Sequence, residues 1–220
     1  MLAAMIETLK KISIFNGLSD DDLAALAAIV VTRHYPKNAV IVNEGEKNDT
    51  MFLVLQGRLK IYVSDATGHE LVLNIQGEGD YFGEMVLDEG PRSASVMTLE
   101  PCELAMITRR SLQDCIAANP SLAVAMIHNL IHRCRILTGN AKDLALLDVY
   151  GRLSKLLMAL AEERDGQLVV GEKLTKQAMG DRIGASREMV SRILKDLTAG
   201  GYVRMEKGRL HILRKPPAHW

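Results

Sequence analysis

The first half of the chain alternates short apolar runs with turn residues. Residues 51–55 and 71–75 are typical of these runs, and Gly57 and Gly68 are typical of the turns between them. Apolar and β-branched runs of this length favour strands, and the glycines allow the tight turns of hairpins. We predict strands over residues 40–42, 51–55, 59–63, 71–75, 94–97 and 104–107. Short strands at this spacing indicate an antiparallel sandwich or barrel.

The pattern becomes helical after Arg109. Residues 119–147 contain no proline after Pro120 and a single glycine, Gly139. Apolar residues recur here at alternating spacings of three and four, at Ile127, Leu130, Cys134, Leu137, Ala141 and Leu144. Such a stripe usually faces another helix, so we predict a long dimerisation helix. Packing of the stripe on the chain's own barrel is the alternative, and Met126 with Ile131 offers a second apolar face.

Asp148 interrupts this pattern and can cap a following helix. We expect that helix to run from Val149 to about Arg164 and to end at Gly166. The chain has 220 residues, and domains typically have about 100–150 residues. We therefore predict two domains, residues 1–147 and 148–220.

Residues 174–197 have the spacing of a helix-turn-helix. A first helix over residues 176–183 ends at Gly184, and Ser186 can cap a second helix that runs to about Leu197. The apolar positions that we expect to lie inward are Met179, Ile183, Val190, Ile193, Leu194 and Leu197. Residues 200–205 and 209–213 fit a small hairpin, the wing.

The outward face of the second helix carries hydrogen-bonding residues. These are Arg187, Glu188, Ser191, Arg192 and Lys195. Arginine pairs bidentately with guanine, and a carboxylate accepts from cytosine N4, so this face predicts direct base reading. A merely charged, solvated surface is the alternative.

Charge is divided unevenly along the chain, although the formal net charge is zero. Residues 151–220 carry 14 Lys and Arg against 8 Asp and Glu, and residues 1–150 carry 13 against 19. A basic module joined to an acidic one indicates that the C-terminal part meets a polyanion such as DNA.

The most informative segment of the first half runs from residue 79 to residue 95. It contains Gly83, Glu84, Arg92 and Ser93. A glycine lets a backbone N–H approach an oxyanion, and a nearby carboxylate can accept from ribose hydroxyls. Arginine pairs bidentately with phosphate, and serine can donate to the same group. The set predicts a sugar-phosphate site, unless Arg92 simply pairs with Asp88 or Glu89 on a surface turn.

This segment resembles the phosphate-binding cassette of cyclic-nucleotide-binding domains, and residues 14–147 as a whole resemble the β-roll domain of the catabolite activator and fumarate-nitrate regulator (CRP/FNR) family. The resemblance implies that Gly83 offers backbone groups to the effector and that Glu84 binds the ribose 2′-hydroxyl. It also implies that Arg92 and Ser93 hold the cyclic phosphate.

Two features depart from the family pattern. The interval from Glu84 to Arg92 is shorter than in the catabolite activators, and the helix positions that offer two hydroxyls to adenine there fall on Leu137 and Thr138. Leucine cannot hydrogen-bond a purine, so one polar contact that selects adenine is lost. Cyclic AMP is the expected effector, and cyclic GMP, cyclic di-GMP or DNA binding without a ligand are left open.

The second helix of the helix-turn-helix resembles the same family at residues 186–188 and 192–194. The resemblance implies that Arg187 and Arg192 contact guanines and Glu188 a cytosine in TGTGA-like half-sites. The predicted DNA-binding set is Thr175, Ser186, Arg187, Glu188, Ser191, Arg192 and Lys195. A homodimer on palindromic DNA, with RNA polymerase as a further partner, is implied as well.

These patterns predict an α+β fold in a bacterial transcription regulator. Residues 1–147 form an antiparallel β-roll with a long dimerisation helix over 119–147, and residues 148–220 form a winged helix-turn-helix. A regulatory subunit that binds a cyclic nucleotide and acts on a partner protein is the alternative outside this class, and it predicts no sequence-specific DNA binding.

Other classes find little support in the sequence. No apolar stretch approaches the roughly 20 residues of a membrane span, and residues 1–13 suggest an amphipathic helix without a cleavage site. Three cysteines in apolar surroundings suit buried thiols in a reducing cytoplasm. His128 and His132 have no evident third ligand for a metal. We expect no metal or cofactor, and no nucleophile and base indicate an enzyme.

Overall fold

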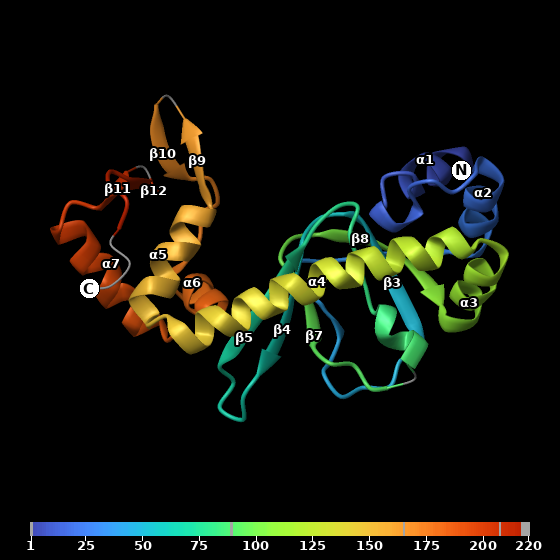
Figure 1. Cartoon of the computed structure of the whole chain (residues 1–220), viewed down its shortest axis with the longest axis horizontal. Helices are drawn as coiled ribbons and strands as arrows, with labels where there is room; N and C mark the ends of the chain where they lie inside the picture. The colour runs from blue at the N-terminus through green and yellow to red at the C-terminus, as the bar shows by residue number, and fades with distance from the viewer. Residues whose placement is uncertain (1, 89, 165, 207, 217–220) are drawn as a thin grey trace. The chain divides into compact units, whose positions relative to one another are not determined.

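The computed structural model of the chain describes residues 2–88, 90–164, 166–206 and 208–216 (Figure 1). The chain divides into two compact units, the first made of Met1–Val63 and Leu73–Arg135 and the second of Ser64–Val72 and Ile136–Trp220. The long helix α4 (Pro120–Leu146) passes from the first unit into the second. Each unit has a hydrophobic core of its own.

The first unit is built on two four-stranded antiparallel sheets, although Ser64–Val72, which includes the start of β5, belongs to the second unit. One has the strand order β1-β8-β3-β6, and the other has the order β2-β7-β4-β5. The strands are β1 (Val31–Tyr35), β2 (Val40–Val42), β3 (Thr50–Gln56), β4 (Leu59–Ser64), β5 (Glu70–Gln76), β6 (Tyr81–Phe82), β7 (Ser95–Thr98) and β8 (Cys102–Thr108). The predicted β-roll is confirmed. Strands β1 and β6 were not predicted, because β1 is mostly polar and β6 has only two residues.

Strand β3 is buried on both faces and packs into two hydrophobic cores. Met51 and Leu53 lie in a core that the helices cover, whereas Phe52 and Val54 lie in a second core with residues of β4 and β7. Successive side chains of a strand point to opposite faces, so a strand that is apolar throughout is buried on both sides. The β1-β8-β3-β6 sheet is therefore the middle layer of the first unit.

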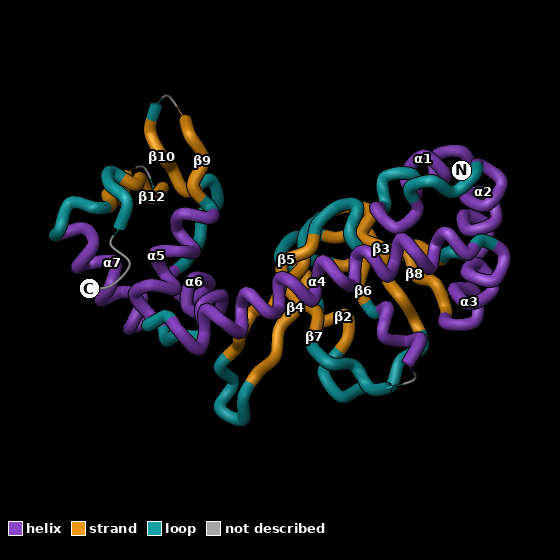
Figure 2. Tube along the Cα trace, viewed as in Figure 1, coloured by secondary structure: helices purple, strands orange, loops and turns teal. Residues whose placement is uncertain are grey.

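Helices complete the first unit. They are α1 (Leu2–Leu9), α2 (Asp20–Ile29), α3 (Arg109–Ala118) and the beginning of α4, with 3₁₀ turns η1 (Ser13–Phe15) and η2 (Glu84–Asp88). Figure 2 shows α1, α2 and α3 gathered at one end of the β-roll. Leu122 and Met126 of α4 are buried in the same core as Leu9 and Leu112, which attaches the start of α4 to the β-roll. In the described part of the chain, no helix is both long and apolar enough to cross a bilayer.

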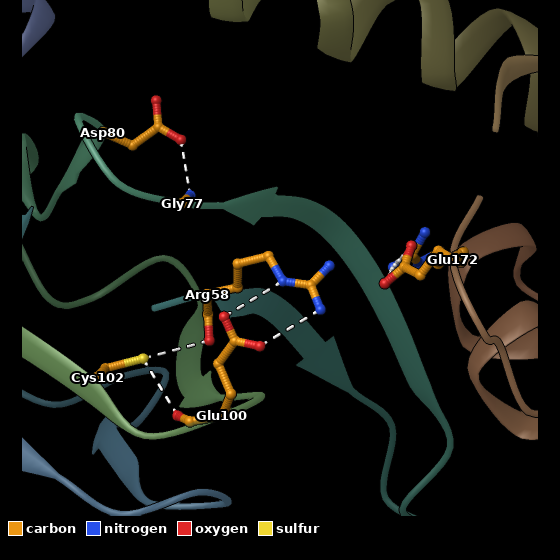
Figure 3. Close-up of polar contacts among 7 residues, drawn as sticks. Arg58, Gly77, Asp80, Glu100, Cys102 and Glu172 are labelled. Carbon is orange, nitrogen blue, oxygen red and sulfur yellow. Dashed lines mark hydrogen bonds and ion pairs between the residues drawn. The ribbon is translucent and has the colours of Figure 1, made fainter. Parts of the chain in front are cut away.

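Polar contacts join the β3–β4 and β7–β8 turns (Figure 3). Arg58 forms an ion pair with Glu100 at 3.4 Å, and the Cys102 sulfur lies 3.3 Å from the carbonyl oxygens of both residues. Cys102 is buried and Cys115 is half-buried, but Cys134 is exposed. The prediction of buried thiols is therefore wrong for Cys134, because this residue lies on the apolar stripe of α4, which faces away from the β-roll.

The second unit contains, beyond the end of α4, a helix-turn-helix and a small sheet. Its elements are α5 (Val149–Ala159), β9 (Ala161–Arg164), β10 (Gln167–Val170), α6 (Lys176–Ile183), α7 (Arg187–Ala199), β11 (Val203–Glu206) and β12 (Arg209–Ile212). The sheet is antiparallel with the order β11-β12-β10-β9. The predicted hairpin of β11 and β12 is confirmed as one half of this sheet.

Helix α5 is shorter than predicted. Asp148 caps it, because its Oδ1 accepts from the backbone N–H of Gly151 at 2.7 Å. The helix ends at Ala159, however, and the following residues form β9. Alanine, glutamate and arginine favour helix over strand, so pairing with β10 overrides the local preference at β9. Gly166 consequently lies between β9 and β10 and not at the end of a helix.

Candidate functional site

The segment that follows β6 brings Gly83 and Arg92 together. Nη1 of Arg92 donates to the carbonyl oxygen of Gly83 at 3.2 Å, and Nη2 donates to the carbonyl oxygen of Thr50. Gly83 has a φ of +82°, and a side chain there would begin 2.5 Å from Nη1 of Arg92. Glycine alone adopts this conformation readily and leaves room for the guanidinium.

The guanidinium of Arg92 is buried. The residue is 7% exposed, and Nε has no hydrogen-bond partner among the described residues. Burial lowers the pKa of Arg92 from its ordinary value, while the carboxylates of Glu84 and Asp49 oppose that shift. Surface pairing of Arg92 with Asp88 is therefore wrong, and Glu89 lies outside the described residues. A buried cation with an unused donor suits an anionic oxygen such as that of a phosphate.

Glu84 forms an ion pair with Arg133 of α4. Oε2 of Glu84 lies 3.0 Å from Nη1 of Arg133, and the side chains are 12% and 20% exposed. Arg133 also donates to the carbonyl oxygen of Tyr81 at 2.5 Å and lies 4.5 Å from the centre of the Tyr81 ring. Sequence reasoning missed Arg133. Its only signal is its position about one helical turn before Leu137 on the predicted long helix.

Of the remaining predicted effector residues, Ser93 lies in the first unit, whereas Leu137 and Thr138 lie in the second. Ser93 is exposed, and its Oγ donates to the sulfur of Met85 in η2 at 3.2 Å, beside Glu84. Leu137 and Thr138 are exposed and lie in the part of α4 that belongs to the second unit. The structure thus brings four of the six predicted effector residues together in the first unit.

The residues of the apolar stripe of α4 are exposed to solvent. Ile127, Leu130, Leu137 and Leu144 are between 39% and 53% exposed, and Cys134 and Ala141 are exposed too. Packing of the stripe on the chain's own barrel is therefore wrong. On the second apolar face Met126 is buried, but Ile131 is 45% exposed. An exposed stripe of this length is the kind of surface that a second helix covers.

Helices α6 and α7 form the predicted helix-turn-helix. Thr175 and Ser186 cap them, because their side-chain oxygens accept from the backbone N–H groups of Ala178 and Met189 at 3.0 and 3.2 Å. Gly184 ends α6 in the left-handed region at φ 64°. The inward positions are all at most 7% exposed, at Met179, Ile183, Val190, Ile193, Leu194 and Leu197. The predicted core of this motif is confirmed.

The outward face of α7 presents its charges to solvent. Arg187, Glu188, Arg192 and Lys195 are exposed, and in the described parts of the chain none of them forms an ion pair. Ser191 is half-buried and accepts a hydrogen bond from Nζ of Lys176 at 2.7 Å. Lys176 was not predicted on this face, although it follows Thr175 at the start of α6. Nη2 of Arg192 donates to the sulfur of Met189 at 2.9 Å, and the exposed guanidinium and carboxylate groups of this face suit base edges.

Fold and site together define a class of protein: a DNA-binding regulator that carries a domain for a small anionic ligand. Residues 32–119 match the cyclic nucleotide-binding domain family, and residues 151–216 match the Crp-like helix-turn-helix domain family. The chain is 32% identical over 207 residues to the CRP-like cAMP-activated global transcriptional regulator of Mycobacterium tuberculosis, with 92% of each chain covered. The chain belongs to the CRP/FNR family of transcription regulators and is not an enzyme.

Two further relatives cover most of the chain. It is 33% identical over 168 residues to the cAMP-activated global transcriptional regulator CRP of Escherichia coli O157:H7, which covers 74% of this chain and 80% of the relative. The structure is similar to that of the c-di-GMP responsive global regulator CLP of Xanthomonas campestris, with a TM-score of 0.78 and 27% identity over 88% of this chain and 99% of that one. These matches exclude a regulatory subunit that lacks a DNA-binding domain.

Proposed function

We propose that this protein is a cytoplasmic homodimer whose sequence-specific binding to DNA is controlled by cyclic AMP. The observation that carries the proposal is the buried guanidinium of Arg92, whose Nε is unused and which lies beside Gly83 and near Glu84. A cyclic phosphate can pair with Arg92, and a ribose hydroxyl can donate to Glu84. The relatives described as cAMP-activated support the choice of nucleotide.

Ligand binding at Glu84 would also act on α4. Arg133 is held by Glu84 on one side and by Tyr81 on the other. A ribose that hydrogen-bonds to Glu84 shares this carboxylate with Arg133, so the attachment of α4 to the β-roll changes. Because α4 carries the exposed stripe, such a change alters the pairing of two α4 helices in a dimer.

In the proposed dimer, two-fold symmetry covers the stripe of α4 with its copy and matches a palindromic site. The two α7 helices then lie about 34 Å apart, one turn of DNA. Arg187 and Arg192 read guanines and Glu188 reads a cytosine of TGTGA-like half-sites, while RNA polymerase is the protein partner.

Cyclic di-GMP is the second candidate effector. The Xanthomonas campestris neighbour is described as c-di-GMP responsive and resembles this chain over nearly its whole length. Leu137 also favours considering another nucleotide. At the two helix positions that recognise adenine in the family pattern, it leaves only the hydroxyl of Thr138.

Calorimetry and fluorescence anisotropy test the proposal. The full-length protein is titrated with cyclic AMP, cyclic GMP and cyclic di-GMP, and its affinity for a palindromic TGTGA duplex is measured with and without each. Binding of cyclic AMP that raises DNA affinity supports the proposal. A response confined to cyclic di-GMP favours the second candidate, and DNA binding that none of the three changes overturns effector control.

The dimer is tested through Leu130. Leu130→Glu places a charge in the proposed seam, so we expect monomers in sedimentation at concentrations where the wild type is dimeric. Ile136→Glu is the matched control, because Ile136 is equally exposed on α4 but lies off the stripe. A dimeric Leu130→Glu protein would assign the interface to another surface.

A further inference from the structure

Arg152, in the first turn of α5, contacts backbone carbonyl groups at the ends of two other helices. Its Nε donates to Ile183 at 2.8 Å, Nη1 donates to Leu147 at 2.8 Å, and Nη2 donates to Gly184 at 3.5 Å. Ile183 is the last residue of α6, Gly184 is its C-cap, and Leu147 directly follows α4. The last carbonyls of a helix lack partners within the helix and carry partial negative charge. One guanidinium therefore joins the end of α4 to the turn of the helix-turn-helix.

Other contacts bring α4 to the same place. The side chains of Leu144 and Leu71 lie 3.5 Å from the point where a side chain on Gly184 would begin. Lys155 of α5 forms an ion pair with Asp143 of α4 at 2.5 Å. All of these residues belong to the second unit. The turn between α6 and α7 thus lies close to Leu144 of α4 and is held by hydrogen bonds from Arg152.

We propose that Arg152 is the positioning residue that links the recognition helix to α4. Helix α7 starts at the cap Ser186, two residues after Gly184, so the direction of α7 follows from where the carbonyls of Ile183 and Gly184 are held. Since Arg152 holds those carbonyls and that of Leu147 together, a displacement of α4 moves α7 with it. The inference deepens the proposed function, because it assigns the residue through which an effector-dependent change in α4 reaches the DNA reader.

The chemistry requires arginine at this position. A guanidinium presents five N–H donors in a rigid fork and reaches three carbonyls in different directions. The compact ammonium of lysine keeps the charge but lacks the separated donors of the fork that reach three carbonyls in different directions. Arg152→Lys therefore weakens the bridging hydrogen bonds while it keeps the positive charge at this position.

Arg214 offers a matched control. Its Nη2 donates to the carbonyl oxygen of Gly200 at 2.6 Å and its Nε donates to that of Gly201 at 3.4 Å, at the end of α7. Its guanidinium also lies 4.9 Å from the centre of the Tyr202 ring. Arg214→Lys thus removes the same kind of cap in the same unit, at carbonyls that directly follow α7 and not at those that join α4 to the α6–α7 turn.

The experiment compares Arg152→Lys and Arg214→Lys in the full-length protein. The measured quantity is the ratio of DNA affinities with and without cyclic AMP, by anisotropy on a palindromic TGTGA duplex. We expect this ratio to fall at least about fivefold in Arg152→Lys, the lower end of usual coupling factors, and to stay near the wild-type value in Arg214→Lys. An unchanged ratio in Arg152→Lys overturns the inference.

Hydrogen exchange separates this inference from the proposed function. If wild-type DNA binding does not respond to cyclic AMP, the proposed function fails, and exchange rates then decide the role of Arg152. We expect faster exchange at residues 140–147 and 184–187 together in Arg152→Lys, because the link protects both segments, and no change at residues 140–147 in Arg214→Lys. Wild-type rates at both segments in Arg152→Lys would refute the link.

Discussion

Arg92 and Arg187 carry the same guanidinium group, but the protein places them in opposite environments. Arg92 is buried and donates to two backbone carbonyls of its own chain, whereas Arg187 is exposed in the first turn of α7. A small ligand can be surrounded, so its site uses a desolvated cation that is fixed in advance. DNA is an extended surface, so its reader must project side chains from a rigid helix.

The difference has a consequence for stability. Arg92 satisfies the carbonyl oxygens of Gly83 and Thr50, so it belongs to the structure of the β-roll as well as to the effector site. Arg187 has no comparable structural role, because the side chain of Ser186 caps the start of α7. Changes at Arg92 therefore mix binding and folding, while changes at Arg187 isolate recognition.

Arg92→Ala should produce the largest effect. Charge-assisted hydrogen bonds contribute about 1.5–3 kcal/mol each, so the loss of two to a phosphate lowers cyclic nucleotide affinity by about 100-fold or more. Calorimetry measures this loss. We also expect a lower melting temperature, because the half-buried carbonyls of Gly83 and Thr50 lose the guanidinium as a donor, and Arg92→Lys should restore part of both. Unchanged nucleotide affinity in folded Arg92→Ala would contradict the pocket.

Arg187→Ala should have a smaller effect that is confined to recognition. The expected loss is about 1–3 kcal/mol of DNA binding, with relaxed selection at one base pair and an unchanged melting temperature. Anisotropy on duplexes that vary one base pair at a time measures it. Equal weakening on every duplex would show that Arg187 contacts phosphate and does not read a base.

Lys195 lies on the same face of α7 as Arg187 and is expected to contact phosphate, not a base. Lys195→Ala should weaken all duplexes alike and reduce the slope of log affinity against log salt by about 1, because a phosphate contact releases counterions without reading sequence. Titrations at several salt concentrations measure the slope. A change in base preference would assign Lys195 to direct readout instead.

The two regions also differ in how far the sequence predicts them. The helix-turn-helix is local: its turn at Gly184, its cap Ser186 and its inward residues follow one another closely, and these were predicted, whereas the cap role of Thr175 was not. The effector site is assembled from distant segments. Gly83, Glu84 and Arg92 share one recognisable segment, but Arg133 reaches Glu84 only through the packing of α4. No local signal fixes that packing.

The same distinction explains the errors in secondary structure. The strands of β3 and β5 were predicted because they contain apolar runs bounded by turns. Strand β9 was predicted as helix, because Glu162, Glu163 and Arg164 are good helix formers, whereas pairing with β10 makes this segment a strand. The sequence also left undecided whether the α4 stripe packs on its own barrel or on another helix. Periodicity identifies the apolar face of a helix but not the surface that covers it.

Tyr81→Phe should have the smallest effect on nucleotide affinity. It distinguishes the role of the Tyr81 ring from that of its hydroxyl. The residue is fully buried, and its hydroxyl has no hydrogen-bond partner in the described structure. Burial raises the pKa of Tyr81 to about 12, with Glu84 and Asp80 adding to the shift and Arg133 opposing it. Tyr81→Phe removes the hydroxyl but keeps the carbonyl and the ring that contact Arg133, so nucleotide affinity should not change.

The pH dependence of stability tests this assignment. The unfolded phenol ionises near its ordinary pKa of about 10, whereas the folded phenol keeps its proton to about pH 12. The folded state therefore binds more protons in this interval, and wild-type stability should fall as the pH rises from 10 to 12. Tyr81→Phe should lose stability less steeply over that interval and differ from wild type by no more than about 1 kcal/mol at pH 7. Parallel declines of the two proteins in urea unfolding would show that the Tyr81 hydroxyl reaches solvent in the folded state.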